Sequence, residues 1–250
     1  MKARKILVSV AALALVAAIS IGGTLAYLTS KTNTVKNVFT VGNVHIKLDE
    51  ALVDGNGKKL NPEQRTTENN QGNKYNLMPN HVYDKDPTVT VLAHSEEAFV
   101  RMLVTVTFDR DLELQKAENE VTRKLLNDAL TNPGAIFTGG SKNWELQENN
   151  DAVGTVTVDG KAYTQLVLEY RYSTTVANNT DSDSPLPALF TKVEVPTDWD
   201  NEQLNAIGGF TIDIVAEAIQ ADGFEDTVEN GVVTVKAADK AWAAFDEQYA

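Results

Sequence analysis

Four long segments of this chain alternate apolar and polar residues, and this period of two limits the fold more than any other feature of the sequence. The alternating segments are residues 44–48, 100–108, 166–172 and 210–218. Successive side chains of a β-strand point to opposite faces, so such segments are typical of strands with one buried face. Shorter candidates cover residues 88–92 and 189–195, and Asp159-Gly160 predicts a tight hairpin turn between two more strands. The sequence therefore predicts a mainly β protein with two stacked sheets.

Two other segments have the spacing of helices. Residues 111–130 carry apolar side chains at helical intervals and are followed by Asn132-Pro133-Gly134, which stops a helix. A last helix is predicted near the C-terminus, with Asp239 as its cap and Trp242, Phe245 and Tyr249 on one side. The polar loops are too short and too mixed to be linkers between domains. We therefore expect one sandwich domain over residues 27–250, with a few inserted helices.

The first 26 residues have the layout of a secretory signal, which would form an N-terminal signal helix. Basic residues at positions 2, 4 and 5 precede an uncharged span over residues 6–21. Two glycines end this span, and Thr24 and Ala26 then place small residues at the −3 and −1 positions of a cleavage site. We expect cleavage after Ala26, so that the mature chain begins at Tyr27 and works outside the cell or at its surface.

A retained membrane anchor is the alternative reading of the same segment. Residues 6–28 are mostly apolar, and their number is sufficient to cross a hydrocarbon core of about 30 Å. Cleavage is favoured because the span is rich in alanine and ends in Gly-Gly and a small-x-Ala tripeptide instead of a basic stop. Contact with the membrane is expected only through the uncleaved leader.

Charge and the absence of cysteine limit the partners of the mature chain. Without the three basic residues of the leader, 19 basic and 35 acidic side chains remain, a net charge of −16. Such a surface repels nucleic acid and anionic lipid. There is no cysteine, so disulfides, thiolate zinc sites and thiol nucleophiles are all excluded. The folded domain must be stabilised by its core alone.

Motifs for catalysis are not found in the sequence. The three histidines are His45, His81 and His94, and neither a G-x-S-x-G elbow nor an H-E-x-x-H pair is present. His81 and His94 could join Asp84 and Asp86 in a metal site only if their strands paired. No phosphate loop or dinucleotide motif occurs. The prediction is a protein without a catalytic site, a metal site or a cofactor.

Two blocks near the N-terminus carry a family resemblance. Residues 22–28, GGTLAYL, followed by residues 38–46, VFTVGNVHI, resemble the exported bacterial proteins of the TasA/camelysin family, which a dedicated SipW-type signal peptidase processes. Residues 77–108 and 189–224 look like later strands of that family. The resemblance implies a jelly-roll-like β domain, a SipW-type signal peptidase as a partner and, for TasA-like members, assembly into matrix fibres. Camelysin members carry a peptidase label, but the chain has no matching zinc-peptidase motif.

The start of the mature chain suggests how such assembly could occur. The polar segment 27–38 carries scattered apolar residues, and the predicted assembly arm uses Leu28, Val35, Val38 and Phe39. An extended arm can complete the edge of a sheet in the next subunit, and a head-to-tail contact of this kind gives a filament. The alternatives are that the arm folds back as a strand of its own domain or has no fixed structure.

Three functions remain open from the sequence. The leading one is a non-enzymatic cell-surface or biofilm-matrix structural protein that associates with itself or with other matrix or surface proteins. The second is a secreted metallopeptidase of the camelysin kind. The third is a monomeric adhesion module that binds a ligand through loops such as residues 177–187.

Overall fold

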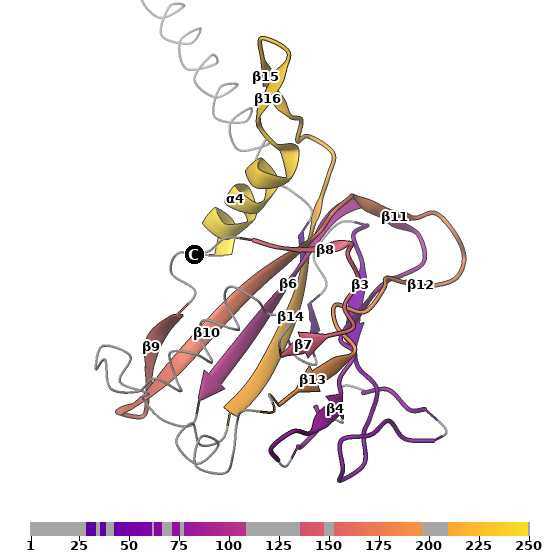
Figure 1. Ribbon diagram of the computed structural model, residues 1–250. Coiled ribbons are helices and arrows are strands. Elements are labelled where there is room, and N and C mark those ends of the chain that lie inside the picture. The colour runs from indigo at the N-terminus through magenta and orange to yellow at the C-terminus, as the bar shows by residue number, and fades with distance from the viewer. Residues whose placement is uncertain are drawn as a thin grey trace, which may run out of the picture.

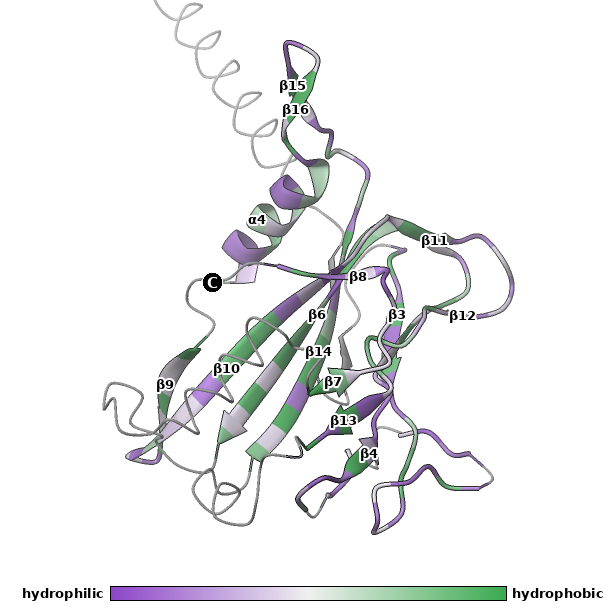
Figure 2. Ribbon diagram, in the orientation of Figure 1, coloured by the Kyte–Doolittle hydropathy of each residue, from purple (hydrophilic) through white to green (hydrophobic). Residues whose placement is uncertain are grey.

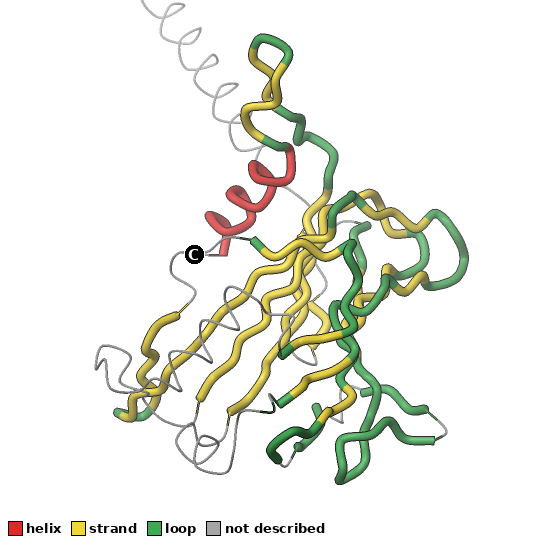
Figure 3. Tube along the Cα trace, viewed as in Figure 1, coloured by secondary structure: helices red, strands yellow, loops and turns green. Residues whose placement is uncertain are grey.

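The computed structural model describes residues 29–33, 36–38, 43–61, 63–66, 72–75, 78–108, 136–147, 153–195, 197 and 210–249 (Figure 1). Strands dominate this part of the chain, and its one helix lies against the upper part of the sheets (Figure 3). All strand pairs are antiparallel. The mainly β architecture confirms the mainly β class predicted from the period of two.

The largest sheet has eight strands and is built around one long central strand. Its main path is β2-β1-β14-β6-β10-β8, with β11 paired to β6 and β9 paired to β10. These strands are β1 (Thr29–Asn33), β2 (Lys36–Val38), β6 (Ser95–Phe108), β8 (Trp144–Leu146), β9 (Val153–Val158), β10 (Lys161–Tyr172), β11 (Val176–Asn178) and β14 (Phe210–Gln220). The register of β14 on β6 runs over eleven residue pairs, from Phe210 opposite Phe108 to Gln220 opposite Ala98. The predicted hairpin is confirmed: Asp159 and Gly160 have φ of 51° and 76°, and they connect β9 to β10.

Two three-stranded sheets supply the opposite layer. One has the order β12-β5-β3 and the other β4-β13-β7. Their strands are β3 (Ile46–Asp49), β4 (Val82–Asp84), β5 (Thr88–Val91), β7 (Phe137–Thr138), β12 (Ser184–Pro185) and β13 (Lys192–Glu194). The strand predicted over residues 189–195 is thus shorter than expected. Phe137 and Phe190 stack in this layer with 4.7 Å between their ring centroids.

The core between the layers is formed by alternate residues of the long strands. On β6, Val100, Met102, Val104 and Phe108 are buried, and Leu166, Leu168 and Ile214 join them from the neighbouring strands. Figure 2 shows the same alternation as green and pale bands along β6, β10 and β14. Asp49 departs from the pattern, because this residue of the expected polar face of β3 is buried. An ion pair with Arg65 compensates for its burial.

The helix α4 (Ala237–Tyr249) covers part of the other face of the large sheet. Because neighbouring residues of a strand alternate, Ala218 points into the main core while Ile219 packs against Trp242 and Phe245 of α4. The helix begins two residues before Asp239, so the predicted cap is wrong. Asp226 caps the helix instead, because its carboxylate accepts a hydrogen bond of 2.7 Å from the Ala237 amide. Asp239 forms an ion pair with Arg171.

Arg101 fixes α4 to the sheet. The Glu217 carboxylate, on the neighbouring strand, is 2.7 Å from the Arg101 guanidinium, and Asp246 of α4 also binds this guanidinium. The Arg101 guanidinium carbon lies 4.4 Å from the ring centre of Trp242, a cation–π geometry. We call Arg101, Glu217, Asp246 and Trp242 the Arg101 cluster.

A small hairpin that the sequence analysis missed projects beyond α4 (Figure 1). It consists of β15 (Thr227–Glu229) and β16 (Val232–Val235), which pair with each other and with no other described strand. The predicted signal helix and the predicted helix over residues 111–130 lie outside the described residues. Within the described ranges, no helix is both long and apolar enough to cross a membrane.

Candidate functional site

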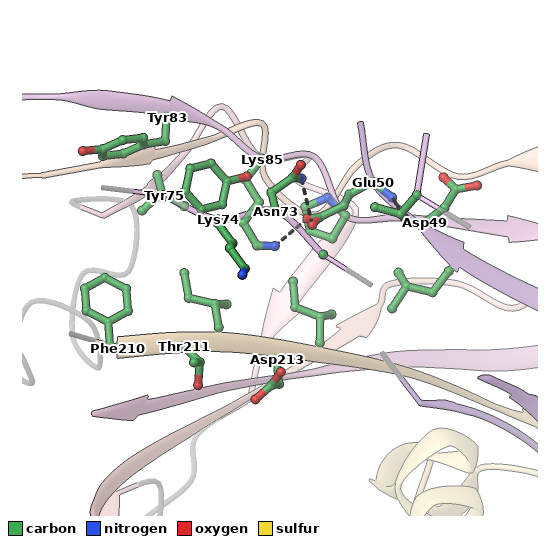
Figure 4. A pocket seen from close by; sticks show the side chains of 17 residues that line it. Asp49, Glu50, Asn73, Lys74, Tyr75, Tyr83, Lys85, Phe210, Thr211 and Asp213 are labelled. Atoms are coloured by element: carbon green, nitrogen blue, oxygen red, sulfur yellow. Dashed lines mark hydrogen bonds and ion pairs between the residues drawn. The ribbon is translucent and has the colours of Figure 1, made fainter. Parts of the chain in front are cut away.

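A cleft of about 620 Å³ lies between β14 and the loops of the opposite layer (Figure 4). We call it the β14 cleft. Ligand pockets in proteins occupy about 300–1,000 Å³, so its volume is sufficient for a small molecule or a few side chains of another protein. It is bounded by residues 48–50, 66, 72–75, 83, 85, 87, 193 and 210–214.

One side of the cleft is apolar because of the alternation in β14. Phe210, Ile212 and Ile214 belong to the face of β14 that packs with the main core. Thr211 and Asp213 also border the cleft, but their side chains point to the opposite side of the strand (Figure 4). Phe210 and Ile212 are only partly buried. A ligand in the cleft would therefore contact apolar side chains on this side.

The facing side carries a buried ion pair. Lys85 donates to a carboxylate oxygen of Glu50, and the side chains of Lys85 and Glu50 are only 7% and 10% exposed. The Asn73 amide donates to the other oxygen of Glu50 at 3.1 Å. A buried charge is costly unless it is paired and hydrogen-bonded, so this arrangement fixes the positions of all three side chains.

Tyr75 and Lys74 complete this side of the cleft. The Tyr75 hydroxyl donates to the carbonyl oxygen of Asp84 at 3.0 Å. Burial raises the pKa of Tyr75 well above its ordinary value, and the nearby charge of Glu50 adds to the effect, so the phenol stays neutral. The exposed Lys74 side chain extends toward the β14 side (Figure 4). No carboxylate among the described residues forms an ion pair with Lys74.

A second ionic group holds the loop beside the cleft. One Asp86 oxygen accepts from the Ala51 amide at 2.7 Å, and the other accepts from Lys59 at 2.6 Å and Arg65 at 3.0 Å. Burial by itself would raise the pKa of Asp86. The hydrogen bonds from Lys59 and Ala51 and the charge of Arg65 outweigh burial and hold that pKa below its ordinary value. This group ties the segment after β3 to the start of β5 and so supports the wall that contains Glu50.

The edge of β14 borders the cleft and is only partly paired. β1 pairs with β14 through three residue pairs, from Thr29 opposite Ile219 to Lys31 opposite Glu217. Residues 210–215 pair with β6 on one side, and no described strand pairs with their other side. We call this stretch the open edge of β14. Unpaired strand edges can accept an added strand.

The structure describes residues 29–33 and 36–38 of the predicted assembly arm as β1 and β2, which fold back onto β14 of the same chain, as in one of the alternatives. Val38 ends β2, where it pairs with Lys31 of β1. Leu28, Val35 and Phe39, together with the predicted cleavage-site residues Thr24, Ala26 and Tyr27, lie outside the described residues.

The histidines considered as metal ligands have separate partners. The His81 ring lies 3.1 Å from the carbonyl oxygen of Asn56, and the His94 ring lies 3.1 Å from Asp181. In the described segments, no three His, Asp or Glu side chains are close enough together to hold a metal ion. Sequence reasoning missed Glu50, Asn73 and Lys85, because their contacts join positions 23 and 35 residues apart and have no local pattern.

Comparisons of the chain with models of protein families, with curated proteins and with solved structures found no match. The function must therefore be argued from the cleft, from the edge of the large sheet and from the sequence.

Proposed function

We propose that this protein is an exported, non-enzymatic subunit of a bacterial cell surface or biofilm matrix, which assembles through the start of its mature chain. The observation that carries this proposal is the position of β1 at the edge of β14, where the described residues form three pairs beside an open edge. The secretory layout of residues 1–26 and the resemblance to the TasA/camelysin family add to it. Processing by a SipW-type signal peptidase and a jelly-roll-like arrangement of the sandwich are parts of the same proposal.

Assembly would use an exchange of equivalent strands. In the single chain, β1 lies on β14 of its own domain, so each subunit has both an arm and a place for one. If β1 of one copy pairs with β14 of the next, the same backbone hydrogen bonds form between subunits. The contact joins two different surfaces, so it does not close on itself and extends into a filament.

Deletion of the arm tests this proposal. We expect that the full chain, expressed with its own leader and recovered from the culture medium, forms fibres visible by electron microscopy. Removal of residues 27–37 should abolish these fibres while the body still unfolds cooperatively, because the core residues lie on other strands. Fibres that form undiminished without the arm would refute assembly through it.

The β14 cleft favours a second candidate, a monomeric adhesion module that binds a small ligand. Size-exclusion chromatography over a concentration series distinguishes the two, since a binding module should remain small at every concentration. The third candidate, a camelysin-type metallopeptidase, is tested separately with casein. Cleavage that a chelator stops and that is lost in His81→Ala or His94→Ala would support the peptidase.

A further inference from the structure

The hairpin of β15 and β16 exposes an unusual amount of apolar surface. Val228, Val232, Val233 and Val235 are 56%, 64%, 48% and 42% exposed. Val228 lies opposite Val233 on one face of the hairpin, and Val232 lies opposite Glu229 on the other. The Asn230-Gly231 turn has φ of 52° and 79°, the left-handed values that a two-residue hairpin turn requires. A two-stranded hairpin is marginally stable alone in water, so apolar residues on both faces indicate that it packs against something.

The tip of this hairpin also carries charge. Glu229 is exposed and adjoins the turn, and no described cation forms an ion pair with it. Glu225 and Asp226 at the base of the hairpin are exposed as well. The surface is thus both apolar and acidic. This combination disfavours anionic lipid and favours a partly apolar protein surface with a lysine at its rim.

The β14 cleft has the complementary character. Phe210, Ile212 and Ile214 line one side, and the exposed ammonium group of Lys74 stands on the other. The second cation in the wall, Lys85, is already paired with Glu50. A hairpin tip in the cleft would place valine methyl groups on the apolar side and Glu229 near Lys74.

The hairpin lies beyond one end of β14, and it projects away from the sheet (Figure 1). The cleft borders residues 210–214 at the other end of this strand. Phe210 borders the cleft, whereas Gln220, at the other end of the strand, leads toward the hairpin. The cleft borders β14 as far as Ile214, so the six residues from Val215 to Gln220 extend roughly 20 Å from it at about 3.3 Å per residue, and β14 is fixed along its whole length by β6. The hairpin therefore cannot reach the cleft of its own chain.

We infer that the β15–β16 hairpin of one copy docks into the β14 cleft of a second copy. The inference rests on the proposed function, because it adds a second head-to-tail contact to the same assembly. The two surfaces differ and lie at opposite ends of the subunit, so this contact is open and also extends along a filament. Burial of the valines supplies the attraction, and the pair of Glu229 with Lys74 sets the register.

A charge exchange tests the docking contact. Secreted protein from the full chain is compared by sedimentation velocity over a concentration series at 0.15 M salt. Glu229→Lys and Lys74→Glu each place like charges together, so each should weaken self-association by about tenfold or more. The double variant restores opposite charges and should return to within about threefold of the wild type, by the same reasoning. Glu247→Lys on the exposed side of α4 is the matched control and should associate as the wild type does.

A pair of valine variants tests the apolar part of the contact. Val233→Ser, on the face opposite Glu229, should weaken association, whereas Val158→Ser, at a 52% exposed valine of the β9–β10 hairpin, should not. Both side chains are exposed in the single chain, so neither change should affect folding. If Val233→Ser and the two single charge reversals all associate as the wild type does, the inference is refuted.

The outcome separates this inference from the proposed function. Loss of association in the hairpin variants, with fibres that persist after removal of residues 27–37, supports the hairpin contact and refutes the arm. If fibres are lost on removal of the arm but the hairpin variants associate as the wild type does, the hairpin contact is refuted and the proposed function is left intact. A wild-type protein that stays monomeric at every concentration refutes both.

Discussion

The Arg101 cluster makes a strong prediction about stability. Replacement of Arg101 by methionine keeps most of the side-chain length but removes the charge beside Glu217, whose side chain is fully buried. Loss of one partner of a buried ion pair costs about 3–5 kcal/mol, because the other charge remains in the protein interior. Loss of the cation–π contact with Trp242 adds about 0.5–2 kcal/mol. The Asp246 carboxylate is 59% exposed and contributes little.

Urea unfolding of the purified protein measures this effect. We expect Arg101→Met to lower the free energy of unfolding by about 3.5–7 kcal/mol, a large part of the about 5–15 kcal/mol that stabilises a typical protein. In Arg101→Met/Glu217→Met the buried charge is removed as well, so most of the loss should be recovered.

Arg171→Met is the matched control for that experiment. Its partner Asp239 is 52% exposed, and its other partner, Glu169, keeps its contact with Arg101, so the cost should be about 0–1 kcal/mol. A cost below about 1 kcal/mol for Arg101→Met, or a double variant as unstable as the single one, would show that the buried charge does not dominate this cluster.

Three further predictions concern the loop beside the cleft, the predicted turn and the leader. The pKa of Asp86 is lowered in the folded state, so its contribution to stability is present above the ordinary value of 3.8 and is lost as the pH falls through the lowered value. Between pH 7 and pH 2, the free energy of unfolding in urea should therefore fall less for Asp86→Asn than for the wild type. Gly160→Ala places a side chain at φ of 76° and should lower the free energy of unfolding by about 1 kcal/mol. Gly154 has no positive φ and has open space around it, so Gly154→Ala is the control and should not lower the free energy of unfolding. Intact-mass measurement of the secreted protein should give a chain that begins at Tyr27, and a secreted chain that retains Met1 would contradict cleavage.

The long strands could be predicted because their signal is local. β6 and β10 alternate buried and partly exposed residues over seven or more positions, and the first seven residues of β14 alternate more and less buried ones, so the period of two is visible without any knowledge of their partners. The Asp159-Gly160 turn was predictable for the same reason, since the turn residues themselves require positive φ. The hairpin of β15 and β16 could have been found as well, because Asn230-Gly231 stands between short valine-rich segments.

The cleft and the Arg101 cluster could not be predicted in this way. Lys85 and Glu50 are 35 positions apart, and Arg101 and Glu217 are 116 positions apart. Such contacts depend on strand order and register, which a local pattern does not determine. Trp144 shows the same limit. It belongs to β8, whose sequence is typical of a polar loop, and this strand is held in place by its pairing with β10.

The most direct test of the proposed function is an intersubunit crosslink between β1 and β14. The chain has no cysteine, so single cysteines can be introduced without competing thiols. Ser30 and Ala218 face each other in the register of β1 and β14, and Ser30→Cys and Ala218→Cys are made as two separate proteins. The two proteins are mixed under assembly conditions, oxidised and separated on a non-reducing gel. Exchange of β1 between subunits predicts a covalent dimer that contains one copy of each variant. Absence of that dimer, in a mixture that still forms fibres, would contradict assembly through the arm.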